Sequence, residues 1–254
     1  MLCYTFFEAN FSIYGTGEPM KYQSRFSRIF FPEKCDRCGR IIPLAHSFCP
    51  HCEENIRVIS DSFCESCGYE KTDCFCESDF NPKLPHIAAV YMYCGDIRER
   101  IHAMKFRGRL SFASSFASDM AKRVRQVYPD VEFDGVCFTP MTKSAEKERG
   151  YNQSRLLAKS LAHKLGVPLN DCLVKIKQTD KQHSLTGQER KQNLKGSFSV
   201  RTPAEAQGKV LLLCDDIKTT GATLNECTEA LFSAGARDVY CICIALADYH
   251  GGKE

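Results

Sequence analysis

The stretch Val210–Thr223, with the sequence VLLLCDDIKTTGAT, decides the fold of this chain. Its apolar first half predicts a buried strand that ends in two carboxylates, Asp215 and Asp216. A loop of small hydroxylated residues with a glycine then opens a helix. In open α/β sheets, ligands bind beyond the carboxyl ends of the strands, where such loops lie. The stretch therefore predicts a ligand site at the edge of a parallel sheet.

The loop after the two carboxylates favours a phosphate group. Backbone N–H groups at the start of a helix have no intrahelical partner, and the helix dipole adds to their preference for an anion. Asp215 and Asp216 are unsuited to phosphate, but their oxygens accept hydrogen bonds from ribose hydroxyls and help to hold Mg²⁺. The residues expected to bind the phosphate through hydroxyls and backbone are Thr219, Thr220, Gly221, Ala222 and Thr223.

A plainer interpretation of D-D-x-x-T-T-G is a helix N-cap beside a solvated acidic turn. The complete run is more demanding, and it resembles the phosphoribosyl pyrophosphate signature of type I phosphoribosyltransferases. That resemblance implies a site for a ribose-5-phosphate group, most directly that of phosphoribosyl pyrophosphate with Mg²⁺. Lys218 departs from the apolar or small residue common there, and it either contacts the ligand or faces solvent.

From residue 86 onward, apolar strands alternate with amphipathic helices. This alternation predicts an α/β domain over residues 86–250, with a mainly parallel sheet covered on both faces. Strands are expected over residues 87–93, 134–138, 208–216 and 238–246, and helices over residues 95–106, 110–128, 153–166 and 222–236.

Two long polar segments accompany these elements. Residues 139–153 are predicted to form a basic and acidic loop whose Arg149 and Gly150 meet pyrophosphate oxygens, or else an ordinary charged surface loop. Residues 179–198 have the profile of a mobile loop that closes over a ligand, or of an exposed helical hairpin. Both segments are long enough to take part in the ligand site.

Eight of the 16 cysteines fall in closely spaced pairs within residues 35–77. This clustering favours metal ligation in a reducing compartment, so we expect a cytoplasmic protein. Two short thiolate knuckles can complete a tetrahedral zinc site, whose binding energy would also fold a segment without a core of its own. The first such set is Cys35, Cys38, Cys49 and Cys52.

The second set has a tighter C-x-C spacing, so its site is either distorted or free of metal, and pairing across the two sets stays open. His46 and His51 either compete as ligands or lie at the surface. Residues 1–34 are predicted to form a loose tail and a short helix. The second set is Cys64, Cys67, Cys74 and Cys76.

The overall charge says little about partners. The formal net charge is +3, from 34 basic and 31 acidic side chains, which argues neither for nor against nucleic acid. No stretch approaches the roughly 20 apolar residues that a membrane span needs. The N-terminus lacks the basic start and continuous apolar segment of a signal peptide.

Taken in order, the motifs resemble the ComF family of competence-related proteins. They are the cysteine module, K-F-R-G at 105–108, R-G-Y-N-Q at 149–153, T-x-x-Q-x-x-L with E-R-x-x-N-x-x-G-x-F at 179–198, and the phosphate loop. The resemblance implies a double zinc ribbon joined to a type I phosphoribosyltransferase fold. It also implies a role in DNA uptake during natural transformation, with competence proteins as partners.

Two hypotheses follow for the function. In the first, the chain is a phosphoribosyltransferase that transfers the pentosyl group to an unidentified acceptor in nucleotide metabolism. Asp215, Asp216 and Arg149 would then carry the chemistry by positioning the ribose, Mg²⁺ and pyrophosphate. In the second, the chain keeps the pocket but handles single-stranded DNA through basic and aromatic residues at 25–31 and 105–109.

Overall fold

The computed structural model describes residues 35, 40–42, 49–54, 56–74, 76, 86–177 and 194–247. The chain divides into two compact units, residues 1–49 and 50–254, and the second unit contains every strand named below. The expected tail and helix over residues 1–34 lie outside the described residues. The predicted domain limits at residues 34, 77, 86 and 250 stay predictions.

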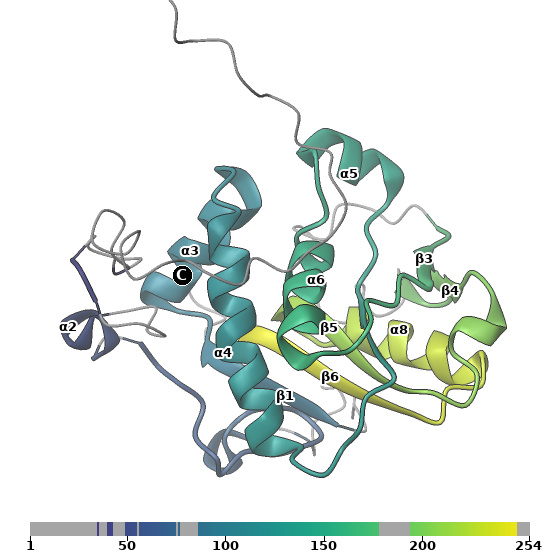
Figure 1. Cartoon of the computed structure of the whole chain (residues 1–254), viewed down its shortest axis with the longest axis horizontal. Coiled ribbons are helices and arrows are strands. Elements are labelled where there is room, and N and C mark those ends of the chain that lie inside the picture. Colours follow the sequence, from purple (N-terminus) through teal and green to yellow (C-terminus); the bar gives the residue numbers. More distant parts are fainter. Residues whose placement is uncertain are drawn as a thin grey trace, which may run out of the picture. The chain divides into compact units, whose positions relative to one another are not determined.

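The central sheet has four parallel strands in the order β1-β6-β5-β2. Figure 1 labels β1, β6 and β5 of this sheet. Every residue of β1 and β2 is buried, as expected for a parallel sheet with both faces covered. This confirms the predicted α/β fold with a mainly parallel central sheet. The strands are β1 (Ile87–Met92), β2 (Gly135–Phe138), β5 (Val210–Lys218) and β6 (Asp238–Leu246).

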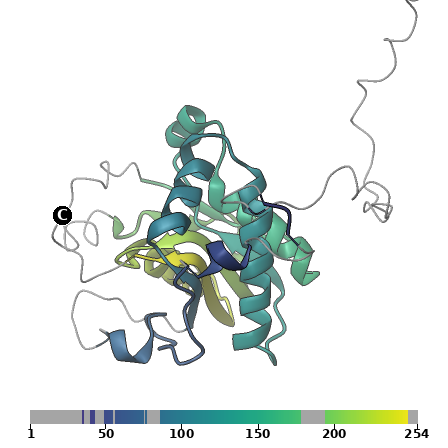
Figure 2. The ribbon, with the colours of Figure 1, turned by 90° about the vertical axis from the view of Figure 1, so that its left-hand side faces the viewer.

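Three helices cover the sheet and a fourth, α3, packs against α4; all four match the helices expected from the sequence. Helix α4 packs against β1 and α6, α6 against β2 and β5, and α8 against β5 and β6. Figure 2 views this unit from the side on which α3 and α4 lie in Figure 1. None of the helices in the described residues is long and apolar enough to cross a membrane. The helices are α3 (Gly95–Phe106), α4 (Ser111–Val127), α6 (Gln153–Leu165) and α8 (Ala222–Ser233).

The segment just before the second cysteine set pairs with the outer edge of the sheet. Val58 forms an antiparallel bridge with Tyr91 of β1, and Ile59 N donates to Val90 O at 2.9 Å. These contacts satisfy backbone groups that an edge strand would otherwise leave unpaired. The cysteine module also contains the helix α2 (Pro50–Glu53), which includes Cys52 of the first set, and the 3-10 helix η1 (Lys71–Asp73), which precedes Cys74 of the second. The ribbon thus continues the sheet beyond β1.

A small antiparallel pair lies beside the main sheet. Strand β3 (Leu173–Lys175) pairs with β4 (Phe198–Val200), and the 3-10 helix η3 (Pro203–Glu205) follows. These strands bracket the polar segment in which the sequence predicts a mobile loop. Residues 179–193 of that segment lie outside the described residues, so its closing over a ligand stays a prediction.

The structure differs from the sequence-based expectation at two places. The predicted loop over residues 139–153 contains a helix, α5 (Lys143–Arg149), because Thr142 caps its start and Gly150 ends it with a φ of 86°. Strand β5 does not end at Asp216 but continues to Lys218. It continues because β6 extends alongside it, with Lys218 opposite Leu246.

Candidate functional site

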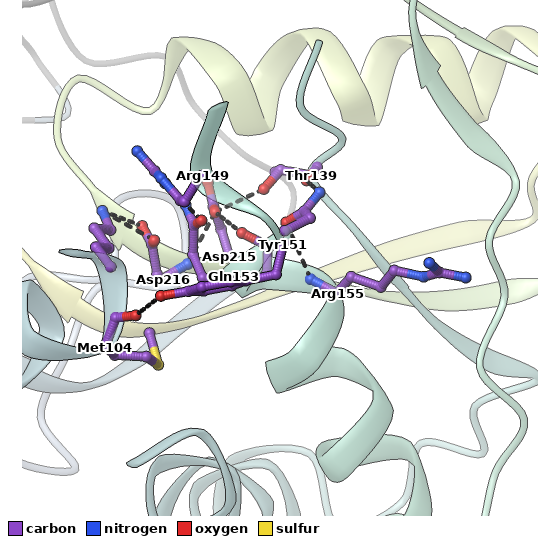
Figure 3. A network of polar contacts seen from close by, with 11 residues as sticks. Met104, Thr139, Arg149, Tyr151, Gln153, Arg155, Asp215 and Asp216 are labelled. Atoms are coloured by element: carbon purple, nitrogen blue, oxygen red, sulfur yellow. Dashed lines mark hydrogen bonds and ion pairs between the residues drawn. The ribbon is translucent and has the colours of Figure 1, made fainter. Parts of the chain in front are cut away.

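Asp215 lies near the carboxyl end of β5, where three groups fix its carboxylate (Figure 3). Its Oδ1 accepts hydrogen bonds from Thr139 Oγ1 at 2.6 Å, Ser154 Oγ at 2.9 Å and the Asp216 amide at 2.8 Å. Thr139 follows β2, and Ser154 lies in the first turn of α6. The carboxylate is therefore held by elements from separate parts of the chain.

The carboxyl group of Asp215 has a raised pKa. Burial raises the pKa of its carboxyl to about 6, and the neighbouring charge of Asp216 adds to the rise. The hydrogen bonds from Thr139, the Asp216 amide and Ser154 oppose that rise. A cation bound beside Asp215 would favour its charged form, so the carboxylate is suited to a metal or another positive ligand group.

Asp216 is paired with a lysine from a distant part of the chain. Lys105 Nζ, in the last turn of α3, lies 3.0 Å from Asp216 Oδ1 and 2.9 Å from Oδ2. Asp216 is only 5% exposed, so the site contains a largely buried charge pair. The sequence placed Lys105 in a DNA-binding group, and its role beside Asp216 was missed. The K-F-R-G motif was the available signal.

The R-G-Y-N-Q element docks on α3 and opens α6. Arg149 Nη1 donates to Gln153 Oε1 at 2.6 Å, and the guanidinium lies 5.0 Å from the centre of the Phe106 ring. The Tyr151 hydroxyl donates to Met104 O, and Asn152 caps α6. Figure 3 shows Arg149 on the same side as the two carboxylates. The element thus holds Arg149 against Gln153 and the Phe106 ring.

The phosphate loop has the geometry of a helix start. Gly221 is the N-cap of α8 with a φ of 77°, a left-handed conformation that favours glycine. Thr219 is exposed, whereas Thr220 is partly buried and its Oγ1 accepts from Ala222 N at 3.4 Å. Because the first amides of a helix lack intrahelical acceptors, the loop offers N–H groups to an anion a few residues after Asp216.

The four cysteines of the second set lie together. Cys64 Sγ is 3.5 Å from Cys76 Sγ, Cys67 Sγ is 3.7 Å from Cys74 Sγ, and all four sulfurs lie within 4.8 Å of one another. A tetrahedral zinc ion with Zn–S bonds of about 2.3 Å needs sulfurs roughly 3.8 Å apart. The set therefore fits zinc despite its C-x-C spacing.

The first cysteine set is described only in part. The sulfurs of Cys35 and Cys49 lie within 4.8 Å of each other. Cys52, three residues after Cys49, is buried as well. Cys38 and His46 lie outside the described residues, whereas His51 is exposed. The buried thiols suit the predicted zinc site.

Two family models match this chain. One describes a double zinc ribbon domain and matches residues 26–98, and the other describes a phosphoribosyl transferase domain and matches residues 152–254. Together with the parallel sheet and its phosphate loop, these matches define the class. The chain is a type I phosphoribosyltransferase-fold protein with an N-terminal double zinc ribbon.

Its relatives narrow the class to one family. The chain is 31% identical to competence protein ComFC of Bacillus subtilis, over 79% of this chain and 72% of that protein. It is 28% identical to DNA utilization protein YhgH of Salmonella typhi, over 85% of this chain and 98% of that protein. The chain belongs to the ComF family of competence-related proteins, as its motifs predicted.

A solved structure of a larger enzyme is also similar. It is the glutamine phosphoribosylpyrophosphate amidotransferase from B. subtilis, which is 21% identical and has a TM-score of 0.34. The match covers 51% of this chain and 26% of the enzyme. A likeness of this degree adds nothing to what the family models establish.

Proposed function

We propose that this chain binds phosphoribosyl pyrophosphate with Mg²⁺ at the carboxyl edge of its sheet and handles imported single-stranded DNA during natural transformation. One observation carries the binding proposal. Segments far apart in sequence meet at Asp215 and Asp216, directly before a helix start suited to phosphate. Membership of the ComF family supports the role in competence.

Each part of the ligand has a counterpart in the site. The start of α8 would hold the 5-phosphate, and Asp215 and Asp216 the ribose hydroxyls and Mg²⁺. Arg149 and the backbone at Gly150 would contact the pyrophosphate. Bound Mg²⁺ would neutralise part of the pyrophosphate charge. The loop residues assigned to the phosphate are Thr219, Thr220, Gly221, Ala222 and Thr223.

The DNA part of the proposal is supported by an exposed aromatic residue beside the site. Phe106 is 55% exposed, and its ring centre is 4.6 Å from that of His102 and 5.0 Å from the Arg149 guanidinium. Arg107 and Arg109 are exposed next to it. An aromatic ring flanked by cations is the arrangement on which single-stranded bases stack. Lys105 is excluded from this surface because Asp216 holds it.

The remaining assignments follow the same logic. The two cysteine sets would each hold one structural zinc ion in a closed four-thiolate site, which requires a reducing compartment and favours the cytoplasm. Other competence proteins are the partners that the family role favours.

Calorimetry tests the ligand. Full-length zinc-loaded protein should bind phosphoribosyl pyrophosphate with Mg²⁺, and Asp216→Asn should weaken that binding at least about tenfold, because a charged contact is lost. The matched control is Asp130→Asn, an exposed aspartate after α4, which should change nothing. Absence of binding by the unaltered protein refutes the ligand assignment.

Gel-shift experiments test the DNA contact. Affinity for single-stranded DNA should fall as salt rises, and Phe106→Ala should weaken it about tenfold, the loss expected for one stacked base. Phe232→Ala is the control, because Phe232 is also exposed but lies on α8. Equal affinities of the two variants would contradict the stacking role of Phe106.

A further inference from the structure

Two buried side chains join the second cysteine set to the phosphate loop. Tyr69 follows Cys67 by two residues, and Lys218 is the last residue of β5. Lys218 Nζ lies 4.7 Å from the centre of the Tyr69 ring, and the two residues are 1% and 2% exposed. An aromatic face is a favourable partner for a buried ammonium group. From the sequence, Lys218 was expected either to contact the ligand or to face solvent. Its burial shows that it does not face solvent.

Backbone contacts close this connection into a clamp. The Tyr69 hydroxyl donates to Ala247 O at 2.7 Å, and Ala247 N donates to Lys218 O at 2.8 Å. Ala247 directly follows β6, so Tyr69 holds the ends of β5 and β6 together. The next residue after Lys218 is Thr219, where the phosphate loop begins. The clamp therefore fixes the point from which the loop departs.

The cysteine knuckle in turn fixes Tyr69. Cys64 N donates to Tyr69 O at 2.8 Å, and Gly68 N donates to Cys64 O at 2.7 Å. Gly68 has a φ of 83°, and a Cβ there would lie 3.4 Å from Leu246 Cδ1. The knuckle is thus folded tightly against the end of β6. A metal ion that holds Cys64 and Cys67 would hold Tyr69 as well.

We infer that Tyr69 and Lys218 are positioning residues through which the second cysteine set holds the phosphate loop in its ligand-binding shape. This inference rests on the proposed binding of a sugar phosphate by that loop. It assigns the second zinc ribbon a part in ligand binding, in addition to its part in folding. The two residues touch neither the metal nor the ligand in this scheme.

The test compares two tyrosines that lose the same atom. Tyr69→Phe keeps the ring and removes the hydroxyl that donates to Ala247 O. The control, Tyr128→Phe, removes the hydroxyl of another buried tyrosine, which directly follows α4. In zinc-loaded full-length protein, Tyr69→Phe and Lys218→Met should weaken binding of phosphoribosyl pyrophosphate with Mg²⁺ at least about tenfold. The control should stay within about twofold, and zinc content should not change.

A second readout needs no ligand. Amide hydrogen exchange across residues 219–223 should be at least about tenfold faster in Tyr69→Phe and Lys218→Met, but not in Tyr128→Phe. Unchanged exchange in both variants overturns the inference, as does binding within twofold of the unaltered protein. If the unaltered protein binds no phosphoribosyl pyrophosphate, the proposed function fails, while the exchange rates still decide whether the clamp orders the loop.

Discussion

Replacing Lys105 with methionine should destabilise the protein, because it leaves the buried Asp216 carboxylate without its cation. At the 2.9 Å separation of Nζ and Oδ2, and an effective dielectric constant of about 20, two unit charges attract by roughly 6 kcal/mol. Desolvation offsets much of that energy, and breaking buried pairs costs about 3–5 kcal/mol. The Lys105 side chain is 19% exposed, so we expect a loss of about 2–3 kcal/mol at neutral pH.

Urea unfolding followed by circular dichroism measures this loss. The control is Lys159→Met, which removes an exposed lysine from α6 and should change the free energy of unfolding by less than about 0.5 kcal/mol. Adding Asp216→Asn to Lys105→Met should recover at least about 1 kcal/mol, because the uncompensated charge is removed. Equal stabilities of Lys105→Met and the control, or no recovery in the double variant, would refute the reasoning.

Three further outcomes are expected. Because the pKa of Asp215 is raised from 3.8 to about 6, the folded protein keeps a proton that the unfolded chain releases between these values, so the free energy of unfolding should fall as pH rises through that window. Asp215→Asn should flatten this slope in urea titrations at several pH values. Cys67→Ser should lower the zinc content, measured by mass spectrometry, by about one ion per chain, whereas Cys94→Ser, outside the cluster, should not. Gly150→Ala and Gly166→Ala both place alanine at positive φ with no atom within 4 Å, so each should lose about 1 kcal/mol of stability in urea, but only Gly150→Ala should weaken pyrophosphate binding in calorimetry.

The sequence predicted the sheet because its strands are nearly uniform runs of apolar residues. The runs VLLLC and DVYCICIAL bury nearly all their apolar side chains only in a strand that is covered on both faces. The amphipathic helices between the strands indicate that the strands are parallel. The same logic located Asp215, Asp216 and the helix start at Gly221, since all three lie within one continuous segment. Local sequence was sufficient wherever the site is built from neighbouring residues.

The partners of the two carboxylates were not predictable in this way. Thr139, Ser154 and Lys105 reach the site from other parts of the chain. Lys105 belongs to the K-F-R-G motif, but nothing in the local sequence of the three residues indicates that they meet the two carboxylates. Helix α5 was missed because a charged segment between a strand and a helix looks the same whether it is loop or helix. Its cap at Thr142 is a single hydrogen bond of 3.2 Å, a feature that composition does not reveal.

The pairing of Val58 with Tyr91 has a consequence for the life of the protein in the cell. Strand β1 is made early, yet its only neighbour within the central sheet is β6, which ends the described part of the chain. Until β6 emerges from the ribosome, the segment around Val58 is the one pairing partner of β1, among the described residues, that has already been synthesised. A cell short of zinc would therefore produce nascent chains with an uncovered, wholly apolar strand, and such chains are prone to aggregate.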